Sequence, residues 1–284
     1  SNFIIEPLIK ETAACIGYSA VKLLRKDPEA VMIVLPSDHH IEKEEQFINT
    51  LKQGLEIAQR ENCLVTMGIK PSRPETAYGY IETGKALEGQ WEIPTYKVKR
   101  FTEKPNREKA QEFIYKGTYL WNSGMFICKA SVLLKQYRKF LPEMYQCLKK
   151  ISDFIGTEEE ESVVEQEYNK IDGISIDYGI LEKTWDVFVM ECSFIWDDIG
   201  NWSALERYMR KDESGNSIKG ICSTMDTHNC ILYGDKRMIA AIGVEDLIIV
   251  DTDDVVLVCK KDRDQDIKLF LKELLQDKEN SKFV

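Results

Sequence analysis

The chain has 284 residues and a mass of 32.8 kDa, enough for one large domain, or a large and a small one, with a sizeable buried core. Its formal net charge of −10 argues against a nucleic-acid-binding surface, because phosphate contacts need clustered Lys and Arg, but a pocket for one nucleotide is not excluded. No apolar run approaches the ~20 residues of a membrane span and no signal peptide opens the chain, so we expect no membrane attachment.

The eight cysteines are dispersed, mostly in apolar contexts, and none forms a CxxC pair. In a chain of this length, such usage is typical of a reducing cytoplasm rather than of a disulfide framework. The histidines are His39, His40 and His228, and they form no cluster with zinc-ligand spacing. We therefore expect a cytoplasmic protein without a zinc site.

The first part of the chain alternates between helix and strand patterns. Apolar faces at helical spacing predict helices over Glu11–Arg25 and Lys43–Arg60, and short apolar runs predict strands over Val31–Leu35 and Cys63–Gly68. Alternation with short connections favours parallel strands joined by right-handed crossovers. We expect an α/β fold with a mostly parallel central sheet.

The stretch VMIVLPSDHH, residues 31–40, combines a predicted strand with polar residues at its end. An apolar run bounded by Pro36 predicts a central strand buried on both faces, with Asp38 just beyond its carboxyl end. In open α/β sheets ligands bind at that position, and a carboxylate there suits Mg²⁺. Alternatively, Asp38 caps the following helix, whose pattern begins near Glu42. These residues alone leave both interpretations open.

Beyond Gly68 the pattern is less regular. The range 69–84 is rich in Pro, Gly and Thr and is typical of a loop that enters a short strand. Further elements are predicted in chain order: a strand over Tyr96–Phe101, a helix over Arg107–Tyr115, a turn and strand over Leu120–Cys128, helices over Ala130–Lys139, Met144–Phe154 and Ile174–Lys183, strands within Val187–Ile195, and a helix over Trp202–Met209.

From about Lys211 short β-like runs recur, separated by turn residues. This texture predicts a small β-rich domain that a helix over Asp264–Gln276 closes. The stretch KDESGNS looks like a linker. We therefore expect one domain over residues 1–212 and a second over residues 213–284.

Five stretches are unusually rich in polar residues, glycine and aromatics: PSDHH (36–40), TAYGYIETG (76–84), FTEKP (101–105), WNSGMF (121–126) and WDDIGNW (196–202). Each has an ordinary explanation. Glu-Lys before proline is typical of a solvated turn, Asn-Ser-Gly of a tight turn, and WDDIGNW of a helix N-terminus capped by Asp198. Their order along the chain carries more information than any one of them.

The order PxDH, YGYI, FxEKP, WNSGMF, SIDYGxxEK and WxDxGxW resembles the mannose-1-phosphate guanylyltransferases, from Glu6 to at least Trp202. The resemblance implies a Rossmann-like nucleotidyltransferase domain followed by a small C-terminal β domain. It also implies a reaction in which mannose 1-phosphate attacks the α-phosphorus of GTP in line, giving GDP-mannose and pyrophosphate. Mg²⁺ is the implied cofactor, and positioning and charge neutralisation are the protein's main tasks.

The resemblance also assigns the residues of the metal and sugar sites. Asp38 and Asp198 would hold Mg²⁺, with Asp197 as the competitor for the second role. Asp38, Lys104 and Asp198 are the implied catalytic residues. The implied substrate-binding residues are Glu103 and Asn122 on the hexose hydroxyls, Lys104 on the sugar phosphate, and Gly79 with Tyr80 from YGYI; Asp177 and Lys183 would support them.

The segment EPLIKETAACI at residues 6–16 resembles the family's nucleobase region, with Lys10 in place of Arg and Glu11 in place of Asn. Glu11 could accept hydrogen bonds from guanine or face solvent, so base preference stays open. The implied nucleotide-binding residues are Glu6, Lys10, Thr12, Pro36 and Asp38.

One departure from the family pattern concerns the start of the chain. The family opens with a strand and a glycine-rich, Arg-containing loop around the triphosphate, whereas SNFIIEP matches the family after that loop. Backbone N–H groups and a basic side chain there would neutralise transition-state charge. We expect that this piece alone is weakly active or inactive.

Several alternatives remain. The chain could use another base or hexose 1-phosphate, or it could be a non-catalytic sugar-nucleotide-binding subunit, although the retained carboxylates argue against the latter. A metal-dependent glycosyltransferase could use Asp251-Thr252-Asp253 as a D-x-D motif, but a β-turn explains these residues better. The chain could form a homodimer, for which the sequence shows no decisive patch.

Overall fold

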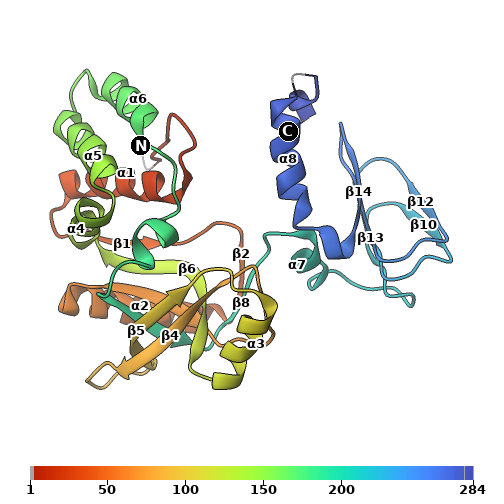
Figure 1. Ribbon diagram of the computed structural model, residues 1–284, viewed down its shortest axis with the longest axis horizontal. Coiled ribbons are helices and arrows are strands. Elements are labelled where there is room, and N and C mark those ends of the chain that lie inside the picture. The colour runs from red at the N-terminus through yellow and green to blue at the C-terminus, as the bar shows by residue number, and fades with distance from the viewer. Residues whose placement is uncertain (1–2, 278, 284) are drawn as a thin grey trace. The chain divides into compact units, whose positions relative to one another are not determined.

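The computed structural model describes residues 3–277 and 279–283, which form two compact units (Figure 1). The first unit runs to Ser37 and then from Ile41 to Trp196. The second unit comprises Asp38–His40 and the described residues from Asp197 onward. The predicted domain boundary between residues 212 and 213 stays a prediction.

A six-stranded sheet forms the middle of the first unit. Its order is β1 (Val31–Val34), β6 (Tyr119–Lys129), β3 (Leu64–Ile69), β7 (Val187–Cys192), β5 (Thr95–Thr102) and β4 (Gly79–Ala86).

The prediction of a mostly parallel sheet is wrong, because within the described residues of this sheet only β3 and β7 run parallel. The other pairings are antiparallel. Two features cause the difference. The strands β4 and β5 form a hairpin, and β6 runs between β1 and β3 in the opposite direction to both. The early helix–strand alternation therefore does not extend to the rest of the sheet.

The strand β1 was predicted to be central and buried on both faces, and this is also wrong. It is the end strand of the described sheet and pairs only with β6. Its side chain Ile33 is 38% exposed, and Leu35 just beyond it is 42% exposed. An end strand has a neighbour on one side only, so the apolar run alone cannot fix its burial.

Helices cover both faces of the sheet (Figure 1). Alternate residues of β7 separate the two cores: Val187 and Val189 pack with one, and Phe188 and Met190 with the other. The first core contains residues of four helices, α1 (Glu11–Lys26), α4 (Ala130–Phe140), α5 (Pro142–Phe154) and α6 (Glu160–Lys170). The second core contains residues of α2 (Glu44–Glu61) and α3 (Arg107–Lys116). A π-helical turn η1 (Asp177–Leu181) replaces the longer helix predicted over Ile174–Lys183.

The second unit is β-rich, as predicted. Parallel β9 (Ser217–Lys219), β11 (Ile231–Gly234) and β13 (Leu247–Asp251) pair in order, and β14 (Val256–Lys260) adds antiparallel to β13. A separate parallel pair consists of β10 (Cys222–Met225) and β12 (Ile239–Ile242). Helices α7 (Trp202–Glu206) and α8 (Asp266–Gln276) flank these strands in sequence, and β2 (His39–Glu42) pairs with β8 (Ile195–Asp198).

The Asp251-Thr252-Asp253 stretch lies at the turn between β13 and β14. The Thr252 backbone N–H donates to the Val255 carbonyl at 3.0 Å, and the buried Asp251 carboxylate is paired with Arg237. These contacts support the turn interpretation over a D-x-D metal site.

The eight cysteines are all free thiols. None of the helices in the described ranges is both long and apolar enough to cross a membrane.

Candidate functional site

A bulge in β6 positions the Asn122 side chain. Asn122 stands opposite Gly68 of β3, and Phe126 stands opposite Thr66. The three β6 residues between Asn122 and Phe126 therefore face the single β3 residue between Thr66 and Gly68. Gly124 takes a φ of +71° there, a left-handed value that favours glycine. The Gly124 N–H donates to Asn122 Oδ1 at 3.2 Å, which fixes the amide's orientation. The Asn-Ser-Gly turn signal in the sequence corresponds to this bulge.

The start of β4, the end of β5, the β6 bulge and η1 bring five predicted residues together in the first unit. We call them the Glu103 cluster: Gly79, Glu103, Lys104, Asn122 and Asp177. Asn122 Nδ2 donates to Asp177 Oδ1 at 2.8 Å, and Lys104 Nζ lies 3.2 Å from Glu103 Oε1. A Cβ added to Gly79 would overlap Glu103 Oε2 and lie 3.3 Å from Asn122 Cβ. Glycine at position 79 therefore makes room for the Glu103 carboxylate.

The electrostatics of the Glu103 cluster are typical of a binding site. Burial raises the pKa of Glu103, the Asp177 charge raises it further, and Lys104 lowers it. Burial also raises the pKa of Asp177, against the hydrogen bond from Asn122. For Lys104, burial lowers the pKa, but the Glu103 carboxylate outweighs it and the net shift is upward. The partly buried carboxylates of Glu103 and Asp177 can accept hydrogen bonds from hydroxyl groups, and the Lys104 ammonium can bind a phosphate.

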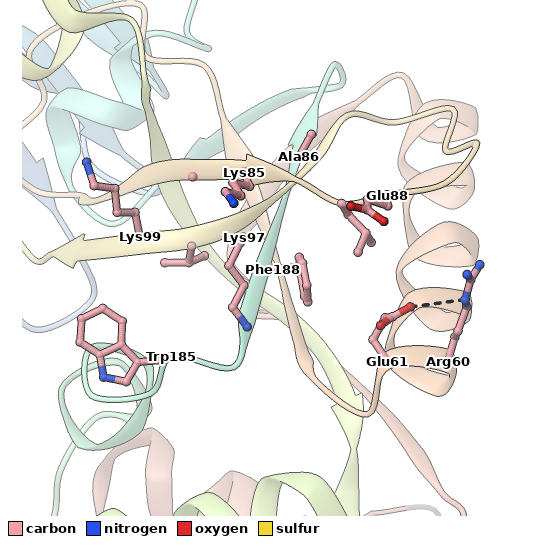
Figure 2. A pocket seen from close by; sticks show the side chains of 12 residues that line it. Arg60, Glu61, Lys85, Ala86, Glu88, Lys97, Lys99, Trp185 and Phe188 are labelled. Atoms are coloured by element: carbon pink, nitrogen blue, oxygen red, sulfur yellow. Dashed lines mark ion pairs between the residues drawn. The ribbon is translucent and has the colours of Figure 1, made fainter.

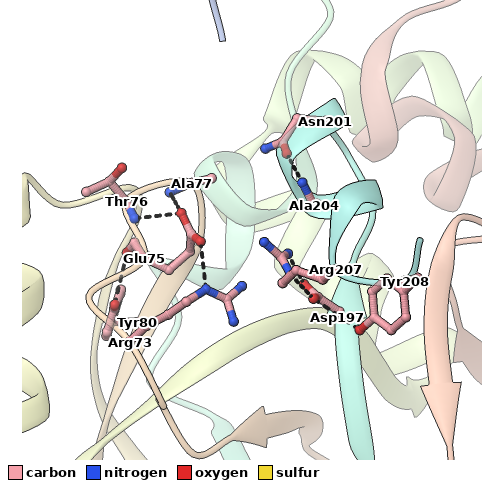
Figure 3. Close-up of polar contacts among 10 residues, drawn as sticks. All are labelled: Arg73, Glu75, Thr76, Ala77, Tyr80, Asp197, Asn201, Ala204, Arg207 and Tyr208. Atoms are coloured by element: carbon pink, nitrogen blue, oxygen red, sulfur yellow. Dashed lines mark hydrogen bonds and ion pairs between the residues drawn. The ribbon is translucent and has the colours of Figure 1, made fainter. Parts of the chain in front are cut away.

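Tyr80 takes a different position from its neighbour Gly79. Its side chain is fully buried, and its ring packs against that of Phe113 with the ring centres 5.4 Å apart. Its hydroxyl donates to the Glu75 carbonyl at 2.9 Å (Figure 3). A substrate could reach Tyr80 only through its backbone, so its predicted role in substrate binding stays a prediction.

The loop before Gly79 is ordered by Glu75 (Figure 3). Its carboxylate accepts the backbone N–H groups of Thr76 at 3.0 Å and Ala77 at 3.2 Å, and Arg73 Nε donates to it at 3.1 Å. The Arg73 guanidinium lies 5.0 Å from the centre of the Trp121 ring, a cation–π contact. Sequence reasoning missed Arg73 and Glu75, whose only signal was their place before the YGYI motif.

Asp198 and its neighbour Asp197 play different parts in the second unit. Arg207 Nε and Nη2 donate to the buried Asp197 carboxylate at 2.6 and 2.7 Å, and the Tyr208 hydroxyl donates to it at 3.1 Å (Figure 3). Successive residues of a strand point to opposite sides, so this ion pair leaves Asp198 on the other side of β8. Asp197 is therefore a structural residue, which favours Asp198 as the second metal ligand.

Asp38 and His39 lie beside Asp198. Burial raises the pKa of Asp198, His39 lowers it, and the Asp38 charge raises it. Burial lowers the pKa of His39, while the charges of Asp198 and Asp38 act in the opposite direction. His39 thus belongs to the carboxylate pair rather than to the start of α2, a place that the sequence alone did not reveal. His40 instead packs against Tyr208, with the ring centres 4.2 Å apart.

Neither carboxylate serves as a helix cap. Lys43 holds the N-cap position of α2, without a side-chain hydrogen bond. Asn201 caps α7, where its Oδ1 accepts the Ala204 N–H at 2.7 Å (Figure 3). The two capping alternatives for Asp38 and Asp198 are therefore wrong.

The donor set of the Asp38–Asp198 pair fits Mg²⁺. Within the described ranges, no group of three or more His, Cys, Asp or Glu residues has the arrangement of a metal site. Mg²⁺, however, is commonly bound by one or two carboxylates, with water and substrate phosphates as further ligands. The Lys268 charge also lowers the pKa of Asp198, and Lys268 lines a 340 Å³ hollow with Gly200. No motif marked Lys268, which lies on α8 far along the chain.

The predicted nucleotide residues fall into separate places. Thr12 Oγ1 accepts the Ile176 N–H at 2.9 Å, and Glu6 accepts the Tyr168 hydroxyl at 3.3 Å. Lys10 precedes α1 at its N-cap position. Pro36 lies instead at the β6 bulge, where a Cβ on Gly124 would be 3.8 Å from its ring, and Asp38 belongs to the second unit. The nucleotide-binding role of these five residues stays a prediction.

Comparison with known proteins gives consistent matches. The family model of nucleotidyl transferases matches residues 1–215, and that of the MannoseP isomerase/GMP-like beta-helix domain matches residues 222–274. The mannose-1-phosphate guanylyltransferase of Klebsiella pneumoniae is 38% identical over 284 residues, covering 98% of this chain. The chain spans 59% of the length of that relative.

Two solved structures are also similar. One, from Thermus thermophilus and described as a mannose-1-phosphate geranyltransferase, matches with 35% identity and a TM-score of 0.80, covering 95% of this chain and 77% of that one. Another, from Helicobacter pylori and described as a mannose-6-phosphate isomerase, matches with 31% identity and a TM-score of 0.56, covering 68% of this chain and 73% of that one.

Proposed function

Because the chain belongs to the mannose-1-phosphate guanylyltransferase family, with a nucleotidyl transferase domain and a β-helix domain, we propose that it transfers GMP from GTP to mannose 1-phosphate. The products would be GDP-mannose and pyrophosphate. The observation that carries this proposal is the Glu103 cluster, in which distant motifs place carboxylates, an amide and a lysine together.

The Glu103 cluster suits a hexose 1-phosphate. Glu103 and Asp177 would accept hydrogen bonds from sugar hydroxyls, and Asn122, held by Gly124 and Asp177, would contact a further hydroxyl. Lys104 would bind the sugar phosphate while Glu103 holds its ammonium in place. The close approach at Gly79 leaves the sugar next to backbone rather than next to a side chain.

Asp38 and Asp198 would hold Mg²⁺, which supplies neutralisation of the phosphate charge when bound. Burial and the mutual repulsion of Asp38 and Asp198 disfavour the ionised form of Asp198, so a bound cation would relieve that cost. Lys268, whose charge acts on Asp198, would add a second positive group for a phosphate at the same place.

In the proposed reaction, a phosphate oxygen of mannose 1-phosphate forms a bond to the α-phosphorus of GTP. The bond from that phosphorus to the bridging oxygen breaks, and pyrophosphate leaves with the electron pair. Lys104 would orient the attacking phosphate, and catalysis would rest on positioning and charge neutralisation. Lys104, Asp38 and Asp198 are therefore the proposed catalytic residues.

A pyrophosphate-release assay with mannose 1-phosphate and Mg²⁺ tests this function, with GTP, UTP and dTTP compared as donors. We expect any release above background to be greater with GTP than with the other two. The weak activity that the sequence suggests stays a prediction. Calorimetry of the three nucleotides therefore measures binding separately from turnover. Equal affinities for all three would remove the guanylyl assignment, and stronger turnover of glucose 1-phosphate would remove the mannose assignment.

We also propose a cytoplasmic location, which the eight free thiols support. The predicted homodimer stays a prediction.

A further inference from the structure

A cavity of the first unit lies on the β4–β5 hairpin and has a volume of about 720 Å³. Its walls come from the hairpin, from the end of α2 and from the residues that lead into β7 (Figure 2). No residue of the Glu103 cluster lines it. The volume lies within the range of about 300–1,000 Å³ of small-molecule pockets. We call this cavity the hairpin pocket.

The lining of the hairpin pocket holds four basic and two acidic side chains, although the chain as a whole carries −10. Its lining includes Arg60, Lys85, Lys97 and Lys99, against the carboxylates of Glu61 and Glu88. Arg60 is 3.3 Å from Glu61, Lys97 is 3.5 Å from Asp186, and Lys99 is 2.5 Å from Glu82. In the part of the chain that the structure describes, the exposed Lys85 has no ion-pair partner. The pocket therefore has a cation available for an anionic ligand.

Aromatic groups stand beside these cations. The Trp185 side chain is 71% exposed, and the Lys97 ammonium lies 4.8 Å from the centre of the Phe188 ring. Figure 2 shows Trp185 and Arg60 on opposite sides of the pocket, with Lys85, Lys97 and Phe188 between them. An exposed indole offers a flat surface for stacking a planar heterocycle.

We propose that the hairpin pocket binds a nucleoside diphosphate, with its base stacked on Trp185 and its phosphates on Lys85 and Lys97. The basic side chains of the lining favour an anion, the exposed indole favours an aromatic group, and the volume accommodates both parts.

Three of the segments that line the hairpin pocket also carry members of the Glu103 cluster. Strand β4 begins with Gly79 and ends with Ala86 in the pocket lining. Strand β5 carries Lys97 and Lys99 and leads into Glu103. The chain from Asp177 to Trp185 includes Glu182, whose Oε1 accepts the Glu103 N–H at 3.2 Å. A ligand that orders these segments would thus change the affinity of the Glu103 cluster for mannose 1-phosphate. This coupling rests on the proposed function.

Photolabelling with 8-azido-ADP tests the binding. An adenine probe is chosen because stacking on an indole does not discriminate between bases, whereas the proposed reaction uses guanine. After irradiation and digestion, mass spectrometry should find label on peptides within residues 84–99 or 183–188. We expect Lys85→Glu and Trp185→Ala each to lower this labelling at least fivefold, with circular dichroism unchanged because both side chains are exposed.

Lys149→Glu is the matched control, since Lys149 is an exposed lysine outside the pocket lining, and its labelling should equal that of the unmodified chain. Label confined to other peptides would overturn the proposal. So would labelling that Lys85→Glu leaves unchanged.

The coupling is tested by titrating mannose 1-phosphate with and without ADP. We expect its affinity to change at least threefold in the unmodified chain and not in Lys85→Glu; an equal affinity with and without ADP would overturn the coupling. If mannose 1-phosphate does not bind at all, the proposed function fails, whereas the photolabelling still decides whether the pocket binds a nucleotide.

Discussion

Gly79 is the residue at which a single methyl group should alter the candidate sugar site. A Cβ there would overlap the Glu103 carboxylate, so Gly79→Ala should displace Glu103. We expect the affinity for mannose 1-phosphate, measured by calorimetry, to fall about tenfold, which corresponds to about 1.4 kcal/mol.

A double-mutant cycle separates this effect from general damage to the fold. In the Glu103→Ala background the added methyl group no longer meets a carboxylate, so Gly79→Ala should then change the affinity little. The same loss in both backgrounds would contradict the role of Gly79 in making room for Glu103.

Asp198 should reduce the stability of the fold at neutral pH. Burial and the Asp38 charge raise its pKa in the folded protein. Because folding raises this pKa, protonated Asp198 stabilises the fold at pH values below its pKa in the unfolded chain, about 3.9. This contribution is lost as the pH rises through the higher pKa of the folded protein. Asp198→Asn should therefore increase the free energy of unfolding at pH 7, by less than about 1 kcal/mol because solvent screens a partly exposed group.

Urea denaturation at pH 7 and pH 3 measures this difference, which should vanish at the lower pH. Asp153→Asn, at an exposed position of α5, is the control and should show no comparable gain at pH 7. A variant at Asp198 that is less stable at pH 7 would show that the carboxylate supports the fold instead of being held there for function.

At the scale of the element, the β8 strand depends on the ion pair that anchors Asp197. Arg207 meets this buried carboxylate with two hydrogen bonds, a geometry that lysine cannot reproduce. Arg207→Ala should leave a buried charge without its main partner and destabilise the second unit by about 2–3 kcal/mol. Hydrogen exchange of the β8 and α7 amides measures the effect.

Tyr208→Phe provides the comparison, because it removes one hydrogen bond of 3.1 Å and should cost about 1 kcal/mol. If Arg207→Ala costs no more than Tyr208→Phe, the ion pair does not anchor β8.

Strand β6 and the β2–β8 pair differ in how much of each could be predicted from the sequence. The β6 motif was recognised as a turn and a strand because Asn-Ser-Gly is a local signal, and the bulge confirms it. The position of β6 between β1 and β3 was not predictable, because antiparallel insertion depends on contacts between segments far apart in the sequence. For the same reason the pairing of β2 with β8, which places Asp38 beside Asp198, came from structure alone.

At the scale of the whole molecule, Mg²⁺ should stabilise one unit selectively. If Asp38 and Asp198 hold the ion, excess Mg²⁺ should raise the free energy of unfolding of the second unit by about 2.7 kcal/mol at one hundred times its Kd. Thermal unfolding in EDTA and in Mg²⁺, with hydrogen exchange measured on β11 and β13 of the second unit, gives the shift. Asp38→Asn and Asp198→Asn should each abolish it, and an equal shift in Asp153→Asn and Asp198→Asn would exclude these ligands.

The sequence motifs identified the family and most of the candidate site, since residues such as Glu103, Lys104 and Asn122 stand in stretches that local composition singles out. Residues that act through the assembled fold were missed. Arg207 and Lys268 lie outside every motif, and the place of His39 beside Asp198 depends on the pairing of β2 with β8. Composition also favoured the α/β class and the small β-rich unit, both of which are confirmed, but strand direction depends on long-range pairing.

The most direct test of the central claim is the calorimetric titration of mannose 1-phosphate into the chain and into its Glu103→Ala, Lys104→Ala and Lys149→Ala variants. The Glu103 cluster predicts binding by the unmodified chain, a loss of at least tenfold in the first two variants, and no change in Lys149→Ala, whose lysine is exposed on α5. Absence of binding by the unmodified chain, or equal affinity in all four proteins, would contradict the assignment of this cluster to the sugar phosphate.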